Sequence, residues 1–164
     1  MTGPAKDKGG RAMPAGMSDA DVDRLAKEVV DWYIQRNPIV ASYLGIHDYD
    51  HLMPSCTYEA EIEEVAQAKE YLRRLGRIDR KGLSPSKWVD HGVLGNAFRL
   101  WIFESESIGV WRSMPRASET VGDGLFPLFM RGFAPLPKRL ESITGRLERS
   151  PTFIKETQGR IRTP

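Results

Sequence analysis

The sequence predicts an all-α fold, a multi-helix bundle of about five to seven helices with no sheet. Apolar residues recur at steps of three and four along most of the chain, which is the spacing of one face of an α-helix. Capping residues followed by proline mark several helix starts, and no alternating run of β-branched residues competes with the helices. A chain of 164 residues is most simply one domain.

The first residues of the chain are the exception to this helical pattern. Residues 1–16 hold four Gly, two Pro and several charges. Such a segment buries too little apolar surface to offset the entropy lost on ordering. We therefore predict a disordered leader over residues 1–17 and a single helical domain over residues 18–164, with Ser18 as the first N-cap.

Two helices are predicted before residue 45. The first runs from about Asp19 to Gln35 and has a single apolar stripe. Pro38 ends it, because a residue that precedes proline is biased away from helical angles. A short helix over residues 39–44 follows, and Gly45 closes it.

Clear start signals open the next helices. Thr57 is placed to cap one helix, and Ser84 followed by Pro85 opens another. The predicted inner face of the first is Ile62, Val65, Ala66, Lys69, Leu72 and Leu75. The predicted inner face of the second is Trp88, His91, Leu94, Phe98, Trp101, Ile102 and Ile108. An apolar segment over residues 125–133, a helix over 136–147 and a last short helix begun by Ser150 and Pro151 complete the prediction.

Composition and charge exclude several classes of function. With 24 basic and 22 acidic residues, the net charge of +2 gives no reason to expect binding to nucleic acid or to an anionic membrane. No apolar run approaches the length of a membrane span, and the start of the chain lacks the apolar core of a signal peptide. Cys56 is the only cysteine, and we interpret it as an inert thiol in a reducing compartment. The expected location is the cytoplasm.

One dense cluster of ionisable residues follows Gly45, namely His47, Asp48, Tyr49, Asp50 and His51. Imidazole and carboxylate groups bind zinc or iron, but a site would need a third ligand, and His91 is the only other histidine. The favoured interpretation is a polar turn whose Asp side chains accept from nearby backbone N–H groups. His91 is interpreted as a core histidine on an apolar helix face.

No sequence motif of a known catalytic centre is present. The chain contains no His-Glu-x-x-His, no cysteine pair and no Gly-rich phosphate loop. We therefore assign no catalytic residue and no metal ligand from the residues themselves.

Several short motifs, in order and spacing, resemble one family. They are Asn37-Pro38, Ala41-Ser42-Tyr43-Leu44-Gly45, His47-Asp48-Tyr49-Asp50, Leu52-Met53-Pro54, Leu83-Ser84-Pro85, Leu125-Phe126-Pro127-Leu128, Phe133-Ala134-Pro135, the helix with Arg139-Leu140 and Arg146-Leu147-Glu148, and Ser150-Pro151. Over about residues 19–164 the chain resembles the N-terminal helical region of the large proteins grouped as domain of unknown function family 885.

This resemblance implies a function that the residues alone do not give. Long members of the family typically carry a C-terminal His-Glu-x-x-Pro-Gly-His-His helix, similar to zinc metallopeptidases of the His-Glu-x-x-His class. None of those residues occurs here, so zinc is expected only in such a C-terminal portion. The chain is then expected to be a non-catalytic domain that shapes a cleft or docks on a catalytic half, with His47, Asp48, Tyr49 and Asp50 as its binding segment.

A second interpretation stays open. The chain would then be a standalone helical interaction module that self-associates as a homodimer through an exposed apolar face. A third and weaker one is a small metal-dependent enzyme that uses His47, His51 and His91.

Overall fold

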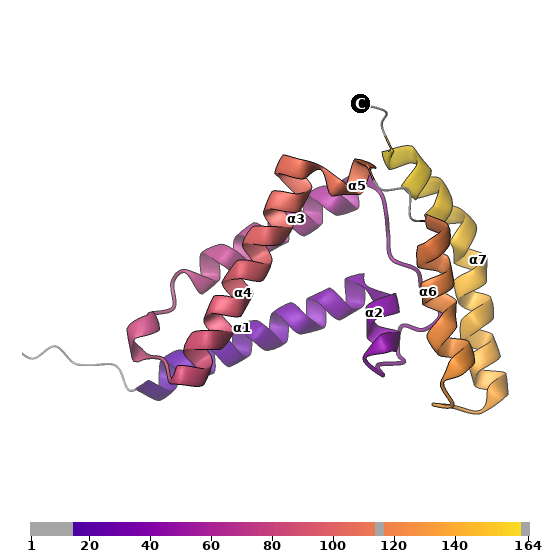
Figure 1. Cartoon of the computed structure of the whole chain (residues 1–164). Helices are drawn as coiled ribbons and strands as arrows, with labels where there is room; N and C mark the ends of the chain where they lie inside the picture. Colours follow the sequence, from indigo (N-terminus) through magenta and orange to yellow (C-terminus); the bar gives the residue numbers. More distant parts are fainter. Residues whose placement is uncertain (1–14, 114–116, 162–164) are drawn as a thin grey trace, which may run out of the picture.

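The computed structural model describes residues 15–113 and 117–161 of the chain. Within these ranges it contains seven α-helices and no strand, which confirms the all-α prediction (Figure 1). Helix α1 (Ala15–Arg36) begins before the predicted start, so Ser18 lies inside it and is not its N-cap. Residues 1–14 of the predicted leader lie outside the described residues.

Three long helices pack together as one group. They are α1, α3 (Tyr58–Leu75) and α4 (Pro85–Phe103), and α3 and α4 run antiparallel (Figure 1). Their shared core consists of Leu25, Ala68, Tyr71, Leu75 and Phe98. The Tyr71 ring lies 5.6 Å from the Trp32 ring and 5.7 Å from the Phe98 ring, measured between centroids, which is the usual separation of packed aromatic pairs.

The predicted capping residues Thr57 and Ser84 start α3 and α4. The Thr57 hydroxyl accepts a hydrogen bond from the Ala60 N–H at 3.1 Å, and the Ser84 hydroxyl accepts one from the Lys87 N–H at 3.4 Å. Each bond satisfies one of the N–H groups that a helix start leaves without an intrahelical partner. A short 3₁₀ turn, η1 (Arg80–Gly82), connects α3 to α4.

The predicted inner face of α3 is wrong in part. Ile62 is 50% exposed and Lys69 is also exposed, whereas Ala68 and Tyr71 are buried. The face that α3 buries is therefore rotated about the helix axis relative to the predicted face. Small alanines and an amphipathic tyrosine, which contribute weakly to an apolar pattern, make the contacts with α1 and α4. On α4, Trp88 is likewise exposed, and its ring lies 4.4 Å from the Arg80 guanidinium.

The end of α4 changes its geometry. A π-helical turn, η2 (Glu104–Ile108), follows α4 directly, and Gly109 ends it with a φ of +70° that favours glycine. Ile108, a predicted inner-face residue, is exposed. The short helix α5 (Val110–Ser113) then leads toward the second half of the chain.

The second half is an antiparallel pair, α6 (Ala117–Met130) and α7 (Leu136–Arg160), joined to the first group through the short helix α2 (Pro38–Tyr43) (Figure 1). The predicted break at Ser150 and Pro151 is wrong, because α7 continues through both residues. The Ser150 hydroxyl, which precedes the proline, donates to the Arg146 carbonyl of the preceding turn at 2.9 Å.

Candidate functional site

A glycine turn sets the position of the predicted binding segment. Gly45 has a φ of +81° and ends α2, as the sequence predicted. The Ile46 N–H donates to the Ala41 carbonyl at 2.9 Å and the Gly45 N–H donates to the Ser42 carbonyl at 3.2 Å, which together form a Schellman motif. This motif turns the chain back, so the residues that follow lie beside α2.

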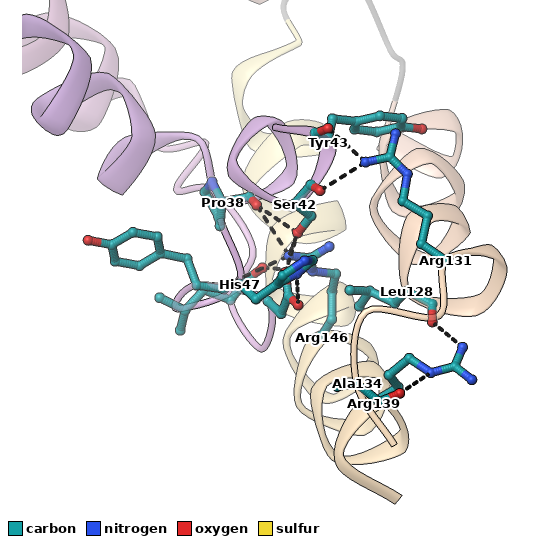
Figure 2. A network of polar contacts seen from close by, with 12 residues as sticks. Pro38, Ser42, Tyr43, His47, Leu128, Arg131, Ala134, Arg139 and Arg146 are labelled. Atoms are coloured by element: carbon teal, nitrogen blue, oxygen red, sulfur yellow. Dashed lines mark hydrogen bonds and ion pairs between the residues drawn. The ribbon is translucent and has the colours of Figure 1, made fainter. Parts of the chain in front are cut away.

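Asp50 belongs to a buried polar network, of which Figure 2 labels Ser42, His47 and Arg146. Its side chain is 1% exposed, and its carboxylate accepts from the Ser42 hydroxyl at 2.5 Å. The second carboxylate oxygen lies 2.8 Å from Nδ1 of His47. Two of the four predicted binding residues, His47 and Asp50, are therefore brought together in a direct contact.

The imidazole of His47 is held on its face as well as at Nδ1. It stacks on the Phe133 ring with a centroid distance of 3.6 Å and an angle of 6° between the planes. Its side chain is 30% exposed, whereas the Asp48 side chain is exposed and the Tyr49 side chain is partly buried. The segment is thus an ordered polar loop, with only one of its ionisable groups fully buried.

Arg146 of α7 completes the network, and the sequence analysis gave it no role of its own. The residue is fully buried, and its guanidinium donates to the main-chain carbonyls of Leu52 at 3.0 Å and of Gly124. Longer contacts reach the carbonyls of Pro38 and Tyr49 and, at 3.1 Å, the Ser42 hydroxyl. Arg146 lies three residues after Ile143 and seven before Phe153, a helical spacing that places all three on one face of α7, and this spacing was the available signal.

The charge of Arg146 is compensated where it lies. Burial lowers the pKa of the Arg146 guanidinium from its ordinary value, because a charged group loses its hydration inside the protein. The nearby Asp50 carboxylate opposes this shift. The guanidinium therefore serves as the point where α2, the loop after it, α6 and α7 are fastened together (Figure 2).

Two further arginines fix the ends of helices around this network (Figure 2). Arg131 donates to the Tyr43 carbonyl at 2.7 Å, at the end of α2. Arg139 donates to the carbonyls of Leu128 and Phe129, at the end of α6, at 3.2 and 3.0 Å. Both place a positive charge where the helix dipole is negative and where carbonyls lack intrahelical partners.

The described residues do not form the three-histidine metal site that the third and weakest interpretation requires. His91 is buried in α4, and its Nε2 lies 3.0 Å from the Leu75 carbonyl, as expected of a core histidine. No group of three His, Cys, Asp or Glu side chains that would hold a metal occurs among the described residues. The pair of His47 and Asp50 orients an imidazole, and no metal-dependent step is assigned to it.

A second polar region lies where the two helix groups meet, and the sequence analysis missed it. We call it the junction cavity, and its volume is about 280 Å³. Its polar wall includes Arg36, Cys56, Glu61, Glu64, Thr157 and Arg160, together with Asn37, Ser55 and Thr120. The spacing of Glu61 and Glu64, three residues apart on one helix, was the available signal, since such residues share a face.

Cys56 borders this cavity as a half-buried thiol. Its burial raises the pKa of the thiol, and the Arg160 charge opposes that shift. Because the thiolate is the reactive form, a raised pKa agrees with the interpretation of Cys56 as an inert residue.

Comparisons with known proteins now place this fold. The model of the family "Bacterial protein of unknown function (DUF885)" matches residues 38–164, and the chain belongs to that family. A solved structure described as "a putative lipoprotein of unknown function from Shewanella oneidensis" matches with a TM-score of 0.73 and 25% identity. The match covers 93% of this chain and 26% of that one, so the chain spans about a quarter of its neighbour's length.

A search of curated proteins gives no match. Among the described helices, none combines the length and the apolar character that a membrane crossing needs.

Proposed function

We propose that this chain acts as a non-catalytic helical domain that packs on the remainder of longer, zinc metallopeptidase-like proteins of its family. In this proposal the zinc and the catalytic groups belong to that remainder. The network of His47, Asp50 and Arg146 holds the loop between α2 and α3 in the shape that the docked partner contacts.

The observation that carries the proposal is an apolar stripe on the outer face of α4. Its apolar members are Val89, Val93, Leu100 and Phe103, which are between 53% and 62% exposed. They are spaced by four and three residues, with Asn96 in the middle, so they lie on one side of the helix. Phe98 and His91 occupy the opposite side and are buried.

A helix that is apolar on two opposite faces is normally covered on both. In this chain α1 and α3 cover one face of α4, and the described residues leave the stripe exposed. Contiguous exposed apolar residues of this kind mark surfaces that contact another protein segment. The solved neighbour, about four times as long as the match, offers such a segment within the same polypeptide.

The solved neighbour allows a direct test of the docking proposal. We expect the outer face of the helix that matches α4 to be buried there under parts of the chain outside the match. The measurement is the accessible area of that helix with and without those parts. A matching face that stays solvent-exposed in the complete structure would refute the proposal.

The chain itself should bind an apolar dye through the stripe. We expect enhanced fluorescence of anilinonaphthalene sulfonate with the wild type. Leu100→Lys should reduce the fluorescence with little change in thermal stability, because the Leu100 side chain is 56% exposed. The matched control is Leu147→Lys, which changes an exposed leucine on α7.

Light scattering on the same samples tests the homodimer alternative, which predicts a dimer that Leu100→Lys dissociates. A compact monomer without dye binding would contradict both functions.

Zinc provides a separate test, because the docking domain is not expected to hold the metal. Titration with zinc should give no stoichiometric binding at micromolar concentration, since the described residues contain no three-ligand group. Calorimetry measures this directly. Tight stoichiometric binding that is lost in His47→Ala would instead support a metal-dependent function of this chain.

A further inference from the structure

The junction cavity is formed by segments that are far apart in the sequence. The end of α1, the loop before α3, the start of α3, α5, the start of α6 and the end of α7 all contribute to its wall. Its apolar lining consists of Pro54, Val110, Trp111, Ala117 and Phe153. Its volume of about 280 Å³ lies just below the range of pockets that hold drug-sized ligands, so its ligand would be small.

Arg160 brings a donor without an acceptor to this cavity. Its side chain is 14% exposed, and its Nε–H group is buried with no hydrogen-bond partner among the described residues. The two terminal nitrogens have weak partners: Nη1 lies 3.7 Å from a Glu61 oxygen and Nη2 lies 3.4 Å from the Cys56 sulfur. Because buried donors are nearly always paired in proteins, this group indicates an acceptor that the described residues do not provide.

Glu64 brings the complementary charge. Its side chain is partly buried in the wall of the cavity, and no described residue forms a hydrogen bond or ion pair with it. Arg36, the other cation in the wall, pairs with Glu63 at 2.9 Å instead. Burial raises the pKa of the Glu64 carboxyl, the charges of Glu61 and Glu63 add to this, and the Arg36 and Arg160 charges oppose it.

A ligand with a single charge would leave one of these two groups without a partner. An anion would satisfy Arg160 and repel Glu64, and a cation would do the reverse. Glu61 is already engaged by the Ser105 hydroxyl at 2.6 Å, so Glu64 is the carboxylate of the wall that no described residue pairs with. The cavity therefore favours a molecule that carries both charges and a small apolar body.

We propose that the junction cavity binds a small zwitterion, an α-amino acid with an apolar side chain. The carboxylate accepts from the Arg160 guanidinium, with Arg36 near, and the ammonium group donates to Glu64. The side chain of the amino acid lies against Trp111 and Phe153. This site is independent of the docking proposal, since none of its residues belongs to the stripe on α4.

The test is calorimetric titration of the chain with leucine and with two analogues that each lack one charge, 4-methylpentanoate and 3-methylbutylamine. Leucine should bind, and each analogue should bind at least about tenfold more weakly, as expected when a charged partner is left unpaired. An absence of leucine binding, or equal affinity for leucine and either analogue, would overturn the proposal.

Glu64→Gln separates ligand recognition from a structural role. The variant should bind leucine about as weakly as the wild type binds 4-methylpentanoate, while its affinity for that carboxylate should rise, because the repulsion by the Glu64 charge is removed. The control is Glu59→Gln, an exposed position on the same helix, which should bind leucine normally. Unchanged leucine affinity in Glu64→Gln would refute the assignment of the ammonium to Glu64.

Stability and pH give a second readout. The folded-state pKa of Glu64 is raised, so the folded protein binds this proton more tightly than the unfolded chain. Its ionised form thus lowers stability at neutral pH, and this loss disappears as pH falls through the raised pKa. Without ligand, Glu64→Gln should raise the melting temperature at pH 7, and leucine affinity in the wild type should fall over the same acidic range. A lower melting temperature would indicate a structural carboxylate and count against the proposal.

Discussion

Arg146→Ala is expected to lower the free energy of unfolding by about 3–5 kcal/mol, the usual effect of removing one partner of a buried charge. The substitution leaves the carbonyls of Leu52 and Gly124 without a donor inside the protein. It also leaves the buried Asp50 carboxylate without the cation beside it. For a chain of this length the melting temperature should fall by roughly 6–20 °C, measured by circular dichroism.

A matched control lies one turn further along the same helix. Arg149 donates only to the Gly145 carbonyl of its own helix and is exposed, so Arg149→Ala should change stability by no more than about 0.5 kcal/mol. Arg146→Lys keeps the positive charge but replaces the planar guanidinium with three donors on one nitrogen. Its stability should lie between that of Arg146→Ala and that of the wild type. If Arg146→Ala unfolds at the wild-type temperature, the network does not fasten the helices.

Phe98→Ala is expected to lower the free energy of unfolding by a similar amount, about 3–5 kcal/mol, because it removes a large buried ring and leaves a cavity. Phe98 is 2% exposed in the core between α3 and α4 and packs on Tyr71. Urea denaturation followed by circular dichroism gives the change directly.

The control for this prediction is two residues away on the opposite face of α4. Leu100 is 56% exposed, so Leu100→Ala should lower the free energy of unfolding of the isolated chain far less than Phe98→Ala does. Equal losses from both variants would mean that the outer face of α4 is already covered, for example by a second copy. That result would favour the homodimer over the docking domain.

Local signals predicted much of the fold because each depends on neighbours in sequence. Thr57, Ser84 and Gly45 act through backbone groups at most a few residues away, and all three work as predicted. The face that α3 buries depends on where α1 and α4 lie, and an apolar count along one helix does not contain that information. The helix break predicted at Pro151 was wrong for a related reason, since α7 continues on both sides and outweighs the local tendency of proline to end a helix.

The candidate site was predictable only in outline. The polar loop after Gly45 was predicted from its composition. His47 and Asp50, which contact each other in this loop, are only three residues apart in the sequence. The partners of Arg146 lie 22 to 108 residues away from it, and most of them are main-chain carbonyls. Every residue has a main-chain carbonyl, so no pattern of side chains in the sequence indicates these contacts.

That choice of partner has an evolutionary consequence. A guanidinium that hydrogen-bonds to the main chain places little demand on the side chains at Leu52 and Tyr49, so those two positions can vary while Arg146 keeps its contacts. Gly124 is the exception, because a methyl group there would lie 3.1 Å from Ile39 and 3.3 Å from Arg146 itself. A lineage can thus rewrite most of this region and keep its shape, in line with a neighbour that retains the fold at 25% identity.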